Sequence, residues 1–259
     1  MAGFFGLFNY EKEGPGIDKD APKKKTFVVF FEMFKINFWK FIPINLVFLL
    51  LNVPLLTGGL ANAGITHVVR NTARDKHSFG MSDFFETIKK NWKQSLIAGI
   101  INLVILFLAT SAAWFYFKEY GATGRIIWLV GLSVTLSLLM IFTFAKFYIW
   151  TMLITFNLPL SAVYKNGFRF AFINLFRNVL VGLLLLVTYA IYGVLIWFLP
   201  GPLRLIVILL AVCTLPAYRY LMIQFAAFPA IKKYMIDPYY EEHPDMDIEK
   251  RRNLGLLDE

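Results

Sequence analysis

Long apolar runs alternate with short polar segments along this chain. Three runs carry no charged residue and cover 95–117, 126–145 and 178–203, and a broken apolar run covers 41–66. A bilayer core needs about 20 apolar residues per membrane helix. Each unbroken run has that length, and because the backbone in lipid must pair its own polar groups, such runs form helices. The pattern therefore predicts an all-α, polytopic membrane protein.

The broken run near the N-terminus predicts a helical hairpin. Val53-Pro54 and Gly58-Gly59 interrupt its middle, and proline removes a helical hydrogen bond while clashing with the preceding turn. We expect one helix at about 34–52, a turn at 53–57 and a second helix at about 58–75. Four spans follow at about 95–117, 126–156, 177–199 and 204–232, which gives about six membrane helices.

Polar segments frame this membrane region on both sides. Residues 1–33 form a polar leader and residues 234–259 a polar tail, so 34–233 is expected to be a single membrane domain. The leader shows neither the basic start nor the long apolar core of a cleavable signal peptide. The first membrane segment is therefore expected to act as an uncleaved signal.

Two basic, aromatic segments are expected to form amphipathic helices beside the membrane. Residues 76–94 begin with a candidate N-cap, Ser82, and residues 160–176 form the second segment. The first segment places lysines on one face and four apolar side chains on the other: Phe84, Phe85, Ile88 and Trp92. This apolar face has two interpretations, a binding surface for a partner protein or a surface that lies on the membrane.

The basic residues orient the predicted helices. The chain has a net charge of +9. If residues 34–75 return to their starting side, 23 of the 26 Lys and Arg residues share the side of both termini. A single crossing would divide them 10 against 16, close to no bias. Because cytoplasmic loops are rich in Lys and Arg, we expect a cytoplasmic (inner) cell membrane protein with both termini cytoplasmic, and no nucleic acid partner.

An aromatic residue followed by a basic one marks the start of three outward helices. The pairs are Trp39-Lys40, Trp92-Lys93 and Phe176-Arg177, and an amide follows the last two, Gln94 and Asn178. Three helix pairs of this kind fit an ancient internal repeat. The same pairs also fit the aromatic and basic residues found at any membrane interface.

The residues offer no enzyme chemistry. His67, His77 and His243 are scattered rather than spaced as metal ligands, and the single cysteine, Cys213, lies in an apolar run. The apolar runs hold no Asp or Glu, whereas membrane enzymes place acidic or His residues in their spans. We expect no enzyme, no metal and no cofactor.

Two cations inside predicted spans are the candidate site residues, Lys146 and Arg219. By helical rise, both lie toward the cytoplasmic ends of their spans, at similar depth. They either snorkel to the interface and contact anionic lipid, or line a basic pocket for a ligand. Four polar residues either line a path or bond across helices: Asn102, Thr135, Ser137 and Gln224.

Two segments resemble the YesL-type family of bacterial integral membrane proteins. The first runs from Leu46 through Val53-Pro54 to Gly58, Gly64 and Arg70, and the second from Asp83-Phe84-Phe85 to Trp92-Lys93-Gln94. The similarity is best over 34–120 and looser at Asn157-Leu158-Pro159 and Arg177-Asn178. The leader and the tail depart from the family's shorter form.

The resemblance implies a function only by association. Genes of this family often lie near carbohydrate uptake systems and sensor kinases, so it implies a non-enzymatic accessory protein of carbohydrate uptake or its sensing. The expected partners are the lipid bilayer, including anionic lipids, and a sugar permease or a membrane sensor kinase. The rival hypothesis is a small transporter of sugar, lipid or ion, for which the Val53-Pro54 break is the candidate mid-membrane site.

Overall fold

The structure, a computed structural model, describes residues 26–74, 76 and 78–242. Most of the predicted leader, most of the predicted tail, His77 and His243 therefore lie outside the described residues. Within that part every regular element is helical, which confirms the all-α prediction. In chain order the elements are α1 (Thr26–Ile36), α2 (Phe38–Asn52), α3 (Gly58–Ala73), α4 (Met81–Thr123), α5 (Ile126–Thr155), α6 (Leu160–Ile173), α7 (Leu175–Phe198), α8 (Gly201–Ile231), the π-helical turn η1 (Lys232–Ile236) and α9 (Asp237–Glu242).

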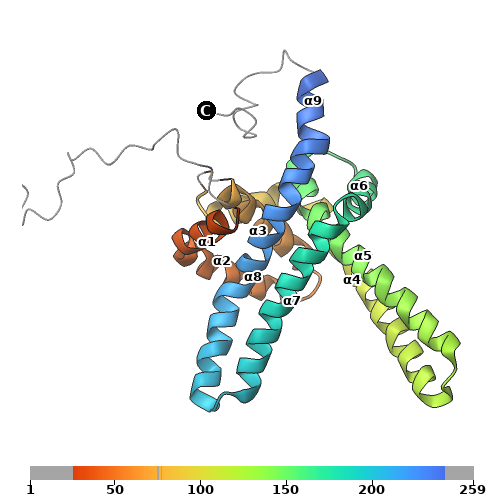
Figure 1. Ribbon diagram of the computed structural model, residues 1–259. Coiled ribbons are helices and arrows are strands. Elements are labelled where there is room, and N and C mark those ends of the chain that lie inside the picture. Colours follow the sequence, from red (N-terminus) through yellow and green to blue (C-terminus); the bar gives the residue numbers. More distant parts are fainter. Residues whose placement is uncertain (1–25, 75, 77, 243–259) are drawn as a thin grey trace, which may run out of the picture.

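The helices form a body from which two long hairpins diverge. Figure 1 shows the α4–α5 hairpin and the α7–α8 hairpin separating below the body, with α9 at the opposite end of the molecule. The body contains α1, α2, α3 and α6 together with the portions of α4, α5 and α8 that pack against them. We call the hairpin ends at Gly124 and Pro200 the distal ends.

Helices α2 and α3 form the predicted hairpin. Their bounds, with residues 53–57 between them, match the expected helices and turn. Gly80 at the start of α4 lies against Lys40 of early α2, whereas Gly59 of early α3 lies against Gly99 of α4. The two short helices are therefore antiparallel, and their turn reaches only as far as Gly99.

The expected number of about six membrane helices is confirmed only in part. Within the described residues, four helices are long and apolar enough to cross a membrane, or five if α1 and α2, bent by 77° relative to each other, count as one span. Helices α2 and α3 have 15 and 16 residues. They are therefore about 22–24 Å long, shorter than the bilayer core of about 30 Å.

The expected surface helix at 76–94 is not a separate element. It is the beginning of α4, a single helix of 43 residues that continues through the first span. Gly80, not Ser82, is the N-cap, and Asp83 Oδ2 accepts a 3.0 Å hydrogen bond from the backbone N–H of Phe79. Since no proline or other helix-breaking residue separates the basic segment from the apolar run, the helix continues without interruption.

The distal parts of both hairpins expose large apolar side chains. Leu108, Trp114, Ile126, Leu186 and Leu205 are all more than half exposed. Exposure of apolar surfaces of this size to water is unfavourable, whereas their contact with lipid is not.

Exposed aromatic side chains stand at both ends of α7, with Phe176 86% and Trp197 78% exposed. These two residues are about 31 Å apart along the helix. That separation fits aromatic belts at the two faces of a bilayer.

A buried asparagine of α2 contacts α8 beside a proline inside that helix. Pro216 lies inside α8 and cannot donate a helical hydrogen bond. The fully buried Asn45 of α2 donates to Cys213 O at 2.6 Å and accepts from Ala217 N at 2.8 Å. One side-chain amide thus joins α2 to the turn of α8 that the proline weakens, just before Arg219.

Candidate functional site

Lys146 of α5 and Arg219 of α8 line one cavity of about 370 Å³. Lys146 lies about 30 Å from the start of α5, and Arg219 about 27 Å from the start of α8. The two predicted site residues therefore come from different hairpins and meet where the hairpins leave the body. We call this space the cationic cavity.

Acidic groups are absent from the described lining of the cationic cavity. The lining residues that the structure describes include neither Asp nor Glu. Lys146 Nζ lies 5.5 Å from the ring centre of Phe142, and the Arg219 guanidinium lies 5.7 Å from that of Tyr220. Ring contacts of this kind stabilise a cation weakly and leave its hydrogen-bond donors free. Two like charges beside one cavity favour an anion between them.

Four side-chain amides and several aromatic rings complete the lining. Asn52, Asn62, Asn102 and Gln224 also line the cavity. The hydroxyl of Tyr220 donates to Asn62 Oδ1. The aromatic walls are Phe48, Phe147, Trp150 and Tyr220. This combination of cations, amides and rings suits a polar, charged ligand better than an apolar one.

Two amide atoms in this lining have no hydrogen-bond partner. Gln224 is 1% exposed and donates from Nε2 to Thr151 at 2.7 Å, but its Oε1 accepts nothing. Asn102 accepts from Tyr164 at 3.2 Å, but its Nδ2 donates to nothing. Buried polar atoms are normally paired. Both atoms are buried rather than exposed, although the two residues line the cavity.

The other polar residues of the predicted path do not reach the cavity. Thr135 and Ser137 lie in the distal half of α5 and donate to the carbonyls of Gly131 and Ser133, one helical turn back. Only Asn102 and Gln224 of the four line the cavity. Thr135 and Ser137 lie at a different depth from Asn102 and Gln224, since a span about 30 Å long can carry polar residues at several depths.

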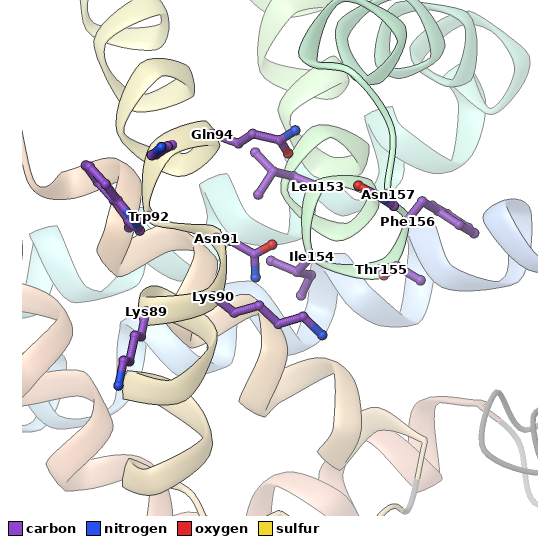
Figure 2. A pocket seen from close by; sticks show the side chains of 11 residues that line it. Lys89, Lys90, Asn91, Trp92, Gln94, Leu153, Ile154, Thr155, Phe156 and Asn157 are labelled. Atoms are coloured by element: carbon purple, nitrogen blue, oxygen red, sulfur yellow. The ribbon is translucent and has the colours of Figure 1, made fainter.

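A second cavity, of about 700 Å³, lies in the body beside the beginning of α4. Its walls are residues 89–94 of α4 and residues 153–157 at the end of α5. Figure 2 shows Lys90, Asn91 and Gln94 extending from α4 toward the α5 side, whereas Lys89 and Trp92 extend away. Gln94 Nε2 donates to Leu158 O at 3.2 Å, so the segments 93–94 and 157–159 of the family resemblance meet here.

Arg70 and His67 of α3 lie beside this region, Arg70 buried and His67 partly buried, and sequence reasoning did not single out the burial of Arg70. Arg70 is 8% exposed and donates from Nη1 to Thr155 at 2.5 Å, while its Nε has no partner. Burial and the neighbouring Arg70 cation lower the pKa of His67 to about 4. His67 is therefore neutral at physiological pH and accepts from Arg70 Nη2 at 3.4 Å.

The predicted apolar face of residues 84–92 is divided by the structure. Phe84 is fully buried in the core against Gly64, and Ile88 packs at the edge of the same core. Phe85 and Trp92 are about half exposed. Phe84 therefore belongs to the folded body, because the helix that carries it packs on α3. The exposed part of the face is Phe85 and Trp92.

The fold and the cationic cavity together define the class: a multi-pass helical membrane protein with a polar cavity where its hairpins leave the body. Residues 41–113 match the model of a family described as "Protein of unknown function, DUF624". The match covers most of α2, all of α3 and much of α4, within the region where the YesL-type resemblance is best. Neither the comparison with curated proteins nor the comparison with solved structures found a match.

Proposed function

We propose that this chain is a non-enzymatic accessory protein of the cell membrane that assists carbohydrate uptake or its sensing. In this proposal the body lies at the cytoplasmic face and the distal ends lie outside. The cationic cavity binds an anionic group at the inner edge of the bilayer. The carbohydrate connection rests on the family resemblance, and the accessory role and the orientation rest on the fold.

The divergence of the two hairpins carries this proposal. Helices α4 and α5 pack on each other, and so do α7 and α8. The two hairpins diverge from each other toward their distal ends, where they expose apolar side chains. Such faces are available to the helices of another membrane protein. Phe85 and Trp92 supply an exposed aromatic surface on the body. Both features favour a protein that works beside a permease or a sensor kinase.

Partner capture tests the accessory role directly. A photo-crosslinking residue at Phe85 or Trp92 should recover a permease subunit or a sensor kinase from intact cells. The same variants without irradiation are the matched control and should not recover that partner. The purified protein alone, in proteoliposomes, should not move sugars. Saturable sugar flux in that preparation would overturn the accessory role.

The transporter hypothesis has one specific observation in its favour. Asn52, the last residue of α2, lines the cationic cavity, and the helix break at 53–57 follows it directly. Transporters use interrupted helices of this kind to hold their substrates. The same proteoliposome measurement separates the two functions. Flux that is lost in Asn52→Leu would place this chain among transporters.

A further inference from the structure

The cationic cavity adjoins an apolar groove of about 320 Å³ on the side of α7 and α8. Phe48, Leu49, Arg219 and Tyr220 line both spaces. Beyond them the groove has an apolar lining from α8, which consists of Ala211, Val212, Leu215 and Pro216. A polar space and an apolar space therefore meet at one charged side chain, Arg219.

The direction of the groove matches the direction of a lipid in the bilayer. Ala211 precedes Arg219 in α8, so the groove extends about 12 Å from the cation toward the distal end. This stretch of α8 belongs to an apolar helix long enough to cross the membrane. The polar cavity lies at the body end of the same helix, where lipid headgroups of the near leaflet would lie.

The charges of the cavity define the headgroup. Lys146 and Arg219 supply donors with positive charge, which suit a phosphate group. Since both cations line the cavity, the ligand carries an anionic phosphate.

We propose that the cationic cavity and the apolar groove form one binding site for an anionic phospholipid. Its phosphate lies between Lys146 and Arg219, and one acyl chain lies along α8 in the groove. This rests on the proposed anionic-group site at the inner edge of the bilayer. It adds the source of the anion, a membrane lipid, and the segment that holds the chain.

Lipid binding can be measured in nanodiscs of phosphatidylcholine that contain a minority of phosphatidylglycerol. Native mass spectrometry of the released protein should show phosphatidylglycerol retained in preference to phosphatidylcholine. The double variant Lys146→Gln/Arg219→Gln should weaken this retention about tenfold or more, since two charge-assisted contacts are lost. The charge-matched control Lys118→Gln/Arg204→Gln, at the distal ends, should retain the lipid as the wild type does.

A groove-filling variant distinguishes a lipid from a free anion. Ala211→Phe occupies the groove and leaves both cations in place, so retention of phosphatidylglycerol should fall while binding of soluble glycerol phosphate is unchanged. Unchanged lipid retention in this variant, or in the double Gln variant, would overturn the lipid site. No preference for phosphatidylglycerol in the wild type would overturn it as well.

Folding of each variant is checked independently. The conservative double variant Lys146→Arg/Arg219→Lys keeps both charges and should keep the lipid. If the Gln double variant lost lipid only because its structure was disturbed, the conservative variant would lose lipid as well. Loss of lipid in both pairs alike would contradict the charge-based account. Sugar flux through pure protein would overturn the accessory role and leave the lipid measurement as it stands, so the two proposals fail separately.

Discussion

Single polar side chains hold this body together at points where the backbone needs them. Asn45 bonds both sides of the weakened turn in α8. The buried Asn178 accepts from Tyr148 Oη at 2.6 Å and donates to Ala171 O at 3.2 Å, which joins α7 to α5 and α6. Gln94 does the same for the segment after α5. Each amide adds a hydrogen bond between segments that are far apart in the sequence.

Replacement of Asn45 tests this account. Asn45→Leu removes both hydrogen bonds between α2 and α8, so the protein should lose about 1–3 kcal/mol of stability. The measurement is the melting temperature in a mild detergent. The matched control is Asn157→Leu, because Asn157 is exposed and should tolerate the change. Equal melting temperatures for the two variants would contradict a bridging role for Asn45.

The partly buried His67 predicts a dependence of stability on pH. Burial first, and then Arg70, lower its pKa from about 6.5 to about 4. Asp83 raises the pKa and Lys90 lowers it, both by less than Arg70 does. The unfolded chain therefore binds a proton between these values that the folded protein does not. Stability that His67 contributes is complete above pH of about 6.5 and is lost as the pH falls toward about 4.

The test compares the wild type with His67→Gln. Glutamine cannot take up a proton, so the melting temperature of the variant should fall less between pH 7 and pH 5 than that of the wild type. Parallel curves would show that His67 is not the titrating group.

At the level of elements, the packing of α3 against α4 depends on two glycines. A Cβ on Gly59 would lie 2.8 Å from the Cα of Gly99, and a Cβ on Gly99 would lie 2.7 Å from the Cα of Gly59. The backbones of the two helices therefore touch, which only small residues permit. This contact fixes how far the short α2–α3 hairpin extends along α4.

A single methyl group should disturb this contact. Gly99→Ala forces the two helices apart and should cost about 1–3 kcal/mol. Gly193→Ala in α7 is the control, because no heavy atom lies within 4 Å of the added Cβ. Alanine favours a helix by about 1 kcal/mol over glycine, so the control should be neutral or more stable. The prediction is wrong if Gly99→Ala melts at or above the control temperature.

The elements that hydrophobic pattern defines were predicted well, and those defined by packing were not. The break at Val53-Pro54 and four of the predicted spans follow from proline and apolar length. The structure has the break, and the described residues contain four helices long and apolar enough to be those spans. The sequence pattern did not predict the continuity of α4, because it changes from basic to apolar residues at about residue 94. Such a change in polarity does not end a helix. The close packing at Gly59 and Gly99 involves residues 40 positions apart, which a single sequence does not pair.

The candidate site shows the same division. Depth along the helix placed Lys146 and Arg219 at one level, and they do line one cavity. The buried charge of Arg70 and the apolar groove beside Arg219 depend on contacts between distant helices, so the sequence did not indicate them. The expected partner face placed Phe84 outside, because helical periodicity shows which residues share a face but not which neighbour covers it.

At the level of the whole molecule, the arrangement is a body with two membrane hairpins rather than a closed bundle. From Gly99 to Thr123, α4 extends about 36 Å beyond the α2–α3 turn, which is enough to cross the bilayer core. The short hairpin therefore lies on the body side of the spans. Most of the basic residues that the structure describes lie there too, while Lys118, Arg125 and Arg204 lie near the distal ends. This asymmetry predicts one orientation in the membrane.

Single cysteines at the two ends of α4 test that orientation. Ser82 and Gly121 are both exposed and about 58 Å apart along the helix. In a Cys213→Ala background, a membrane-impermeant thiol reagent applied to whole cells or spheroplasts should label Gly121→Cys. Ser82→Cys should react only after the membrane is opened, because cytoplasmic segments carry the excess of Lys and Arg. Labelling of Ser82→Cys from outside, or of both positions from one side, would contradict the proposed orientation and place the cationic cavity in the other leaflet.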